Sequence, residues 1–542
     1  MALTRRGFMT RGLLTSLAMS GLVQGGLAGG IRPASAQGGE GGPAEGLPGD
    51  GAVALRVGPP QPFAPSLVRS RARELASRPY EAPQPPVPEP IAGLSYDQYR
   101  DIRYRPDAAV WGGENLPAEL QLFHVGHVYD EPVSINLVSE GTSRHVLFSP
   151  DLFDYGALVP RPVPVDDIGF SGFRLHGPLN RPDYNDEFAV FQGASYFRAI
   201  GAGQSYGLSA RGLAIMTAEP EGEEFPSFRE FWVEKPRPGA SSVVVHALLD
   251  SPSTAGAYRF TIRPGPNTVI DVEAALFPRR DIDKVGLAPL TSMFYFGPQD
   301  RRGIDDFRPA VHDSDGLLIL NGHGEWLWRP LINPARLQIS AFLDQHPQGF
   351  GLMQRDRRFD TYQDLEARYE RRPGLWVEPI GDWGEGSVIL VEIPTESEVH
   401  DNVVAFWRPA EPLKAGEDHL FTYRLTWCAE VPSSPGLARV IGTMVGGAAA
   451  NGHEAPADRR WIVVDFAGGP LDGLAPDDQP VPDVSASGGR LVPGTIQLNP
   501  ESGGRRVAFG LDPEGETGID LRCALMRDGA RISEVWVFRW SE

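Results

Sequence analysis

Cysteine is scarce in this sequence, which has only Cys428 and Cys523 among its 542 residues. Two cysteines cannot provide a disulfide framework for a chain of this length, so a hydrophobic core must hold the fold together. One bridge between them and two buried free thiols both remain open, and we favour the free thiols.

Common cofactor and metal motifs are also missing. The chain has no Cys-x-x-Cys and no His-Glu-x-x-His, so the sequence predicts no metal site. Gly201-Ala202-Gly203 lacks the remaining glycine of a dinucleotide-binding loop and is not set in a β-α-β unit, so no nucleotide cofactor is predicted either. The histidines are not arranged to suggest a nucleophilic triad, although one assembled in space stays open.

Basic residues are outnumbered, with 50 Lys and Arg against 70 Asp and Glu and a net charge of −20. Such a chain repels phosphate backbones and anionic lipids, so nucleic acid is not an expected partner. A neutral polymer such as a polysaccharide meets no such repulsion. Most of this charge serves solubility.

No unbroken apolar run reaches the roughly 20 residues that a bilayer span needs. The nearest approach is at the N-terminus, where Arg5-Arg6 precedes a Gly- and Ser-broken apolar stretch that ends at Ala34-Ser35-Ala36. This pattern is typical of a twin-arginine signal peptide. We therefore predict a signal peptide over residues 1–36, cleavage before Gln37, residence in the periplasm, and no transmembrane span in the mature chain.

The mature chain is predicted to be all-β after a short N-terminal segment. Residues 37–65 are rich in Gly, Pro and Ala and predict a disordered tether. Ser66 can cap a short helix. From about Trp111 the dominant hydrophobic period is two, as in Thr268–Phe277 and Leu420–Trp427. With Gly and Pro at turn spacing, this pattern favours a β-sandwich too large for one immunoglobulin-sized module.

One helix and one domain boundary interrupt this pattern. Asp360 and Gln363 match a capping box, and the spacing predicts a helix that ends before Pro373-Gly374. The stretch 431–436 is rich in Pro and Ser. We predict a large domain over 66–430 and an immunoglobulin-like module over 437–542, with a hairpin turn at Asp528-Gly529.

Three segments combine aromatic rings with Arg, Asp and Gln side chains, namely Phe188–Gly212, Phe307–Arg329 and Gln354–Trp407. Sugar rings stack on aromatic faces, and their hydroxyls bind charged or amide groups. For any single tryptophan, core packing is still the better interpretation. Cleavage of a glycosidic bond needs two carboxyl groups. Asp313 has polar neighbours at a predicted strand edge, and Asp401 lies in the polar stretch Thr395–Asn402, which favours a loop.

These segments carry a resemblance to a known family. The chain resembles the OpgG/OpgD (MdoG) family of osmoregulated periplasmic glucan biosynthesis proteins from about Tyr80 to its C-terminus. The stretches that carry this resemblance are GASYFRAIGAGQSYGLSARG at Gly193–Gly212, EEFPSFREFW at Glu223–Trp232, LDSPSTAGAY at Leu249–Tyr258, APLTSMF at Ala288–Phe294, HDSDG at His312–Gly316 and EIPTESEVHDNVVAFW at Glu392–Trp407.

The resemblance implies a galactose-mutarotase-like β-sandwich with a cleft, joined to a small immunoglobulin-like β-sandwich. It implies action on β-1,2-glucan as an anomer-inverting hydrolase or transglycosylase. Asp401 takes the place of the general acid, Asp313 that of the general base, and Glu398 that of a loop acid on the proton path. The implied glucan contacts are Arg355, Tyr369, Arg372, Trp376, Trp383 and Trp326.

An inverting mechanism requires the acid to stay protonated near neutral pH, through desolvation or a neighbouring negative charge. Glu398 is the expected source of that charge. The loop from Glu396 to His400 shapes the proton route and leaves hydrolysis and transglycosylation both open. The alternative is a non-catalytic glucan-binding scaffold that works beside the inner-membrane glucosyltransferase.

Overall fold

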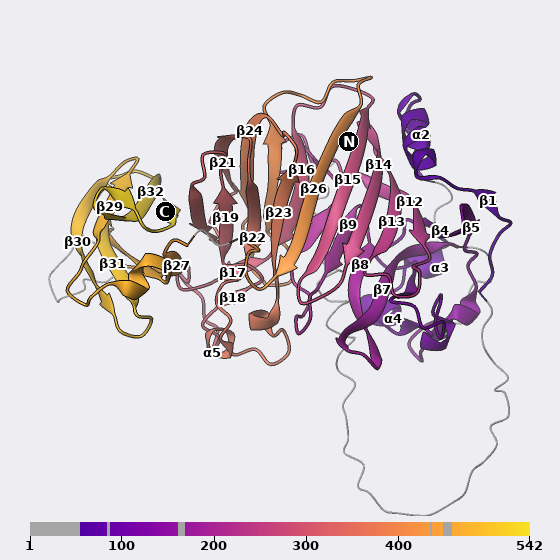
Figure 1. Cartoon of the computed structure of the whole chain (residues 1–542), viewed down its shortest axis with the longest axis horizontal. Coiled ribbons are helices and arrows are strands. Elements are labelled where there is room, and N and C mark those ends of the chain that lie inside the picture. The colour runs from indigo at the N-terminus through magenta and orange to yellow at the C-terminus, as the bar shows by residue number, and fades with distance from the viewer. Residues whose placement is uncertain (1–54, 84–86, 161–167, 434–435, 448–457) are drawn as a thin grey trace, which may run out of the picture.

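A computed structural model describes residues 55–83, 87–160, 168–433, 436–447 and 458–542. The predicted signal peptide (1–36) and residues 37–54 of the predicted tether lie outside these ranges. Nearly all regular structure is β-strand, so the all-β prediction is confirmed (Figure 1).

The first of two large sheets runs the length of the molecule. It is antiparallel except where β4 pairs with β12 and β20 pairs with β34. Its strands, in spatial order, are β1 (Gln61–Pro62), β5 (Thr142–His145), β4 (Ser134–Ser139), β12 (Ser227–Glu234), β13 (Val243–Asp250), β14 (Thr254–Arg263), β15 (Thr268–Pro278), β26 (His419–Cys428), β23 (Gly374–Ile380), β22 (Gly349–Met353), β19 (Gly316–Leu320), β20 (Trp326–Pro330), β34 (Val535–Ser541), β32 (Gly518–Arg527) and β29 (Val481–Ala486), with β33 (Ala530–Arg531) beside β32.

The second large sheet covers one face of the first. Its strands, in order, are β21 (Gln338–Gln345), β24 (Glu385–Glu392), β25 (Val403–Pro409), β16 (Val285–Ser292), β10 (Ser209–Arg211), β9 (Tyr196–Ala199), β8 (Tyr184–Gln192), β7 (Phe170–Arg181) and β3 (Glu119–His124), with β11 (Ala214–Ile215) beside β16. Two small ribbons complete this part, β2 (Ile102–Tyr104) with β6 (Phe153–Tyr155) and β17 (Phe294–Phe296) with β18 (Val311–His312).

An aromatic core joins the two sheets into a sandwich. Phe191 and Phe197, on the second sheet, lie with ring centroids 5.2 and 5.1 Å from Phe260 on the first. The alternation predicted for Thr268–Phe277 is confirmed in β15, where Ile270 and Val272 are fully buried. Period-two sequences therefore place one face of each strand in this core.

The C-terminal module is a second, smaller sandwich (Figure 1, yellow). One layer consists of β27 (Arg439–Gly446), β28 (Arg460–Ala467), β31 (Gly504–Asp512) and β30 (Arg490–Asn499), and the other of β34, β32 and β29. Their facing side chains form one core. Asp528 and Gly529 both have positive φ and turn β32 into β33, as predicted for that hairpin.

The two sandwiches share a sheet, and side chains of the large sandwich enter the core of the small one. Leu327 and Trp328 on β20 pair in parallel with Val535 and Trp536 on β34. Trp326 and Trp376 of the large sandwich also pack in the C-terminal core. The Pro- and Ser-rich stretch therefore marks the point in the sequence where one sandwich ends and the other begins, although the two sandwiches pack directly against each other.

The N-terminal segment departs from the predicted tether. Residues 55–65 lie against the large sheet, where β1 pairs with β5 and Phe63 packs on Trp232. Helix α2 (Pro65–Ala76) follows, with Val68 and Ala72 buried as its predicted apolar face requires. Its N-cap is Ala64, and Ser66 lies inside the first turn, because Pro65 fits the first helical position.

The helix predicted from Asp360 is reduced to a single turn, α5 (Phe359–Tyr362). Gln363 has a φ of 55° and ends it, and Leu365 is 76% exposed. Asp364 pairs with Arg308, a distant residue in the sequence. This tertiary ion pair takes the place of the i,i+4 pair with Arg368 that a longer helix would allow.

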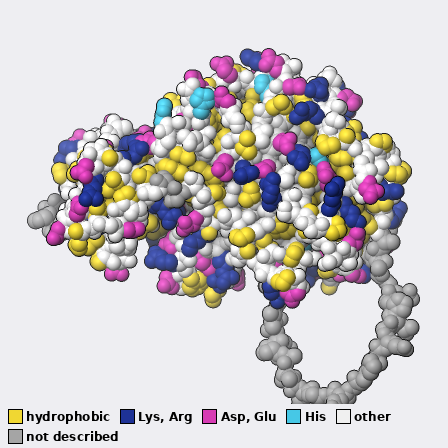
Figure 2. Space-filling model, viewed as in Figure 1, with side chains coloured by type: hydrophobic (Ala, Val, Ile, Leu, Met, Phe, Trp, Pro, Cys, Tyr) yellow, Lys and Arg dark blue, Asp and Glu magenta, His cyan; other side chains and the backbone are white. Residues whose placement is uncertain are grey.

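The remaining helices are short. They are α3 (Glu89–Ala92), α4 (Tyr96–Arg100) and the 3₁₀ turns η2 (Pro106–Ala108), η3 (Pro150–Leu152), η4 (Tyr369–Arg371) and η5 (Gly469–Gly473). No helix in the described ranges is long and apolar enough to cross a bilayer. Figure 2 shows acidic and basic side chains interspersed over the face in view.

Candidate active site

Asp401 and Asp313 lie on either side of one short segment that leaves strand β16. Ser292 ends β16 and pairs with Val403 of the neighbouring β25. The backbone N–H of Asn402 donates to the Ser292 carbonyl (3.0 Å), and the N–H of Asp313 donates to the Met293 carbonyl (2.8 Å). Sheet pairing thus brings two loops together that are far apart in the sequence.

Asp401 is an acid whose surroundings favour the protonated form. It is 7% exposed. Burial raises the pKa of its carboxyl to about 6, helped by the negative charge of Asp313 and opposed by Arg198 and Arg372. Its Oδ2 has no hydrogen-bond partner among the described residues, and Arg198 Nη2 lies 3.9 Å away. A buried, unpartnered carboxyl oxygen suits a neutral acid.

Asp313 differs from Asp401 because it has a direct cationic partner. It is 3% exposed, and Arg372 Nη1 forms an ion pair with its Oδ1. The Arg372 guanidinium also lies 4.4 Å from the Tyr369 ring centroid. Arg372 and Tyr369 were both expected at the site, and the structure places both beside Asp313.

Glu398 is engaged by a different arginine. Its Oε2 lies 2.6 Å from Arg308 Nη2, and Arg308 also pairs with Asp306 and Asp364. The negative charge that raises the pKa of Asp401 therefore comes from Asp313, where we had expected Glu398. Glu398 stays close to the site. Burial raises the pKa of Tyr369, and the charges of Asp313 and Glu398 both add to that rise.

Arg355 lies at the junction of the two sandwiches, where its side chain contacts the C-terminal module. Its Nη1 and Nη2 donate to the two carboxylate oxygens of Glu534, both at 2.8 Å. Its guanidinium covers the Trp328 ring at 3.6 Å. A buried carboxylate and an indole fully engage this side chain, which makes it an interdomain contact.

The three tryptophans named as glucan contacts are packed in cores. Trp326 and Trp376 stack at 5.7 Å in the C-terminal core, and Trp383 packs edge-on against Phe421 and Tyr423. Burial of these large rings outweighs any role as an open platform for sugar. Of the six expected contacts, the structure brings only Tyr369 and Arg372 to the aspartates.

Sequence reasoning missed several side chains around Asp401. Arg198 on β9 donates from Nε to Ser209 Oγ on β10 (2.6 Å). The charge of Asp401 adds to the burial that raises the pKa of Tyr196 to about 12. These residues lie in the segment Gly193–Gly212, which was singled out as a whole without any one of them being chosen.

That segment also contains Gly203-Gln204-Ser205-Tyr206-Gly207, which has the Gly-x-Ser-x-Gly spacing of a nucleophile elbow. Here it connects strands β9 and β10, whereas an elbow leads from a strand into a helix. The backbone N–H of Ser205 donates to the Arg371 carbonyl. Because strand β10, and not a helix, follows Ser205, this segment does not form a nucleophile elbow.

Cys428 and Cys523 are buried free thiols in the C-terminal core, as favoured. Burial raises the pKa of each to about 12, which keeps them protonated and unreactive. Within the described ranges, no group of three or more His, Cys, Asp or Glu side chains is placed to hold a metal ion.

The fold and the site together define a two-sandwich β-protein with a buried aspartate pair that is flanked by arginines. The chain belongs to the family described as periplasmic glucan biosynthesis protein, MdoG, whose family model matches residues 63–540.

Similar proteins are named glucans biosynthesis protein G. One from Vibrio cholerae serotype O1 is 53% identical over 470 residues, which cover 87% of this chain and 85% of the relative. Another from Rhodopseudomonas palustris is 53% identical over 483 residues, covering 89% and 94%. A third from Shewanella frigidimarina is 52% identical over 470 residues, covering 87% and 83%.

Proposed function

We propose that this protein takes part in periplasmic glucan biosynthesis by acting on the β-1,2-glucan backbone as an inverting glycoside hydrolase or transglycosylase. The observation that carries the proposal is Asp401, a buried carboxyl group whose pKa is raised to about 6 beside a second aspartate. A pair of carboxyl groups in unlike environments is what acid and base roles at one glycosidic bond require.

The two aspartates have separate tasks. Asp401 donates its proton to the glycosidic oxygen as the bond from that oxygen to the anomeric carbon breaks. Asp313, as a carboxylate beside Arg372, accepts a proton from a water that attacks the opposite face of the sugar. Attack by water gives hydrolysis, whereas attack by a sugar hydroxyl gives transfer. Either attack inverts the anomeric carbon.

The surrounding side chains support this division. Arg372 orients Asp313, and Tyr369 stacks on Arg372 next to both Asp313 and Glu398. The Glu398 side chain is 35% exposed, enough to exchange protons with solvent. We assign Glu398 to the proton path between solvent and the site.

Replacement of Asp401 by Asn tests the proposal. The variant keeps the shape of the side chain but has no acid proton, so product formation from linear β-1,2-glucan should fall by roughly 10²–10⁴-fold. Chromatography of the products measures this loss, and NMR during turnover reports the anomer formed first.

The matched control is Asp360→Asn, which changes an exposed aspartate of helix α5. It should keep the parent rate. Undiminished turnover by a folded Asp401→Asn chain would remove Asp401 from the acid role, and a retained anomer would exclude inversion.

A second candidate function is a non-catalytic glucan-binding scaffold that works with the inner-membrane glucosyltransferase. The observation that favours it is the burial of both aspartates, 3% and 7% exposed. A scaffold predicts that concentrated protein binds β-1,2-glucan without forming any product, so the same chromatogram separates the two functions.

We also place the protein in the periplasm, exported by the twin-arginine route. The family name supports the compartment, and Arg5-Arg6 supports the route. Replacing both arginines with lysines should leave the protein in the cytoplasm in cell fractionation, whereas export through another route would continue.

A further inference from the structure

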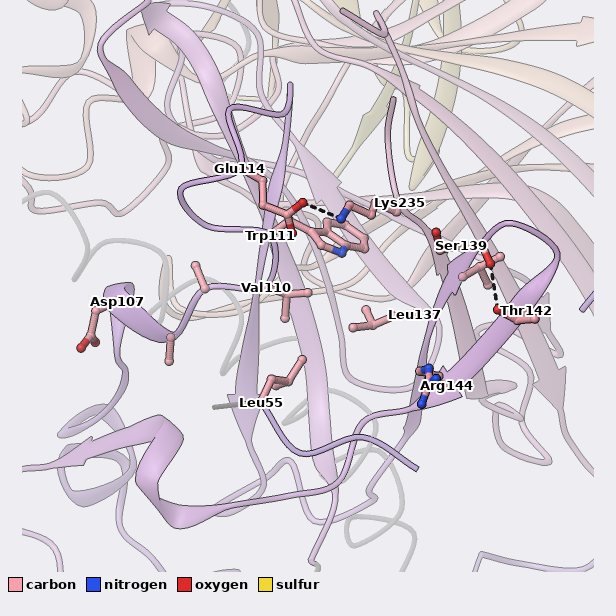
Figure 3. A pocket seen from close by; sticks show the side chains of 13 residues that line it. Leu55, Asp107, Val110, Trp111, Glu114, Leu137, Ser139, Thr142, Arg144 and Lys235 are labelled. Atoms are coloured by element: carbon pink, nitrogen blue, oxygen red, sulfur yellow. Dashed lines mark hydrogen bonds and ion pairs between the residues drawn. The ribbon is translucent and has the colours of Figure 1, made fainter. Parts of the chain in front are cut away.

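A cavity of about 460 Å³ opens at the edge of the large sheet, beside strands β4 and β5. Its floor is apolar, with Val110 and Leu137 between the two walls, and its rim carries exposed polar side chains such as Glu114 and Thr142 (Figure 3). Figure 1 shows β4 and β5 well apart from β17 and β18, which adjoin Asp313. The cavity is therefore separate from the candidate active site.

Trp111 has the largest side chain of the residues that line this cavity. It is half-buried, packs against the core of the large sandwich and lines the cavity. Its φ of 64° lies in the left-handed region, which disfavours bulky residues and suits glycine, as at nearby Gly113 (φ 74°). A glycine would make this turn at lower cost, so the tryptophan is there for its side chain.

The charges around the cavity are mostly compensated within the protein. Lys235 Nζ lies 2.5 Å from Glu114 Oε2, and Asp107 pairs with Arg105. A charged ligand would have to compete with these pairs, and a purely apolar ligand would remove water from the polar rim without replacing its hydrogen bonds. The chemistry favours a neutral ligand that has an apolar face and many hydroxyl groups.

We propose that this cavity is a second carbohydrate-binding site, in which a pyranose ring of a neutral glucan lies on the Trp111 indole. Hydroxyl groups of the sugar donate to the Glu114 carboxylate and accept from Lys235 and Arg144 at the rim. The site holds a glucan strand against the protein without chemistry. The choice of β-1,2-glucan as its ligand rests on the proposed function, but the site itself does not require catalysis.

Binding of long linear β-1,2-glucan, measured by isothermal titration, tests this site. The titrations use the mature chain with Asp401→Asn, so that cleavage does not shorten the glucan. Adding Trp111→Ala should weaken binding about tenfold through loss of the aromatic platform. Trp111→Phe, which keeps an aromatic face, should restore affinity to within about threefold of the parent.

The matched control is Trp461→Ala, which removes a half-buried tryptophan from β28 of the C-terminal module and should leave the affinity unchanged. Parent-like binding by a folded Trp111→Ala chain would overturn the proposal. If circular dichroism shows that this variant does not fold, Lys235→Ala decides in its place, because both members of its ion pair are partly exposed. Unchanged affinity of Lys235→Ala would then overturn it.

Because this test measures binding alone, it is independent of the product assay for Asp401. Loss of glucan binding on changing Trp111 would stand even if the protein formed no product. Conversely, if the protein forms product and the Trp111 variants bind glucan as the parent does, the proposed function stands and the second site is excluded.

Discussion

At the scale of single residues, the two aspartates of the site differ in how closely an arginine approaches each of them. Asp313 has Arg372 in direct contact, whereas Arg198 Nη2 lies 3.9 Å from Asp401 Oδ2. A carboxyl group buried without a close partner is more stable when it is neutral. The same arrangement that suits Asp401 to acid catalysis therefore makes its ionised form costly to the fold.

The pH dependence of stability follows from this cost. The pKa of Asp401 is raised from 3.8 to about 6 in the folded chain, so between those values the folded state binds more protons than the unfolded state. Its contribution to the free energy of unfolding should fall as pH rises through this window, by up to about 3 kcal/mol. Asp401→Asn should remove that decline and be more stable than the parent above pH 6.

Denaturant unfolding of parent and variant at several pH values measures the difference. The gain of Asp401→Asn over the parent should grow across the window and then level off. Asp360→Asn serves again as the control with no such gain. Parallel pH profiles of the parent and Asp401→Asn would show that the acid is not destabilised in the fold.

At the scale of elements, one loop links the two sandwiches. Arg355 follows β22 and pairs with Glu534, which precedes β34 in the C-terminal module. The backbone N–H groups of Arg355 and Asp356 donate to Asp315 Oδ2, two residues beyond Asp313. Arg355 thus connects the C-terminal module to the segment that carries the proposed base.

Glu534→Ala should be strongly destabilising, because it leaves the Arg355 guanidinium without its buried partner. Loss of one member of a buried pair costs about 3–5 kcal/mol. The contrasting variant is Asp520→Ala, whose pair with Arg539 is exposed and should cost less than about 1 kcal/mol. Thermal unfolding of both variants gives the comparison, and equal small losses would show that the interdomain pair contributes little.

At the scale of the whole molecule, the two sandwiches form a continuous structure. Strand β34 completes the sheet beyond β20, and Trp326 and Trp376 are covered by C-terminal residues. Removal of the module would expose an unpaired strand edge and a large aromatic patch. The C-terminal module is therefore part of the core of this protein.

A chain that ends at residue 430 should fail to fold into a soluble protein for this reason. The intact mature chain should unfold in one main calorimetric transition, because its two cores share a sheet. Calorimetry and the soluble fraction of the truncated chain test both statements. A soluble truncated chain with the unfolding temperature of the parent would show that the large sandwich is independent.

The sequence by itself determined the strands and their buried faces. Alternation in β15 and β26 depends on which side chains face a core, and that pattern is local. The family resemblance named Asp313 and Asp401, and the structure places them close together. The turn at Asp528-Gly529 was equally predictable, because backbone φ is a local property.

Only the tertiary structure decided which partners these residues have. The capping pattern at Asp360 predicted a helix, but the pair between Asp364 and Arg308 and the left-handed Gln363 cut it to one turn. Arg355 lies in the contact between the two sandwiches, and the three tryptophans predicted as glucan contacts are buried in the cores. Periodicity specifies a face of an element, whereas contacts between distant segments depend on strand pairing across the sheets, which no local pattern encodes.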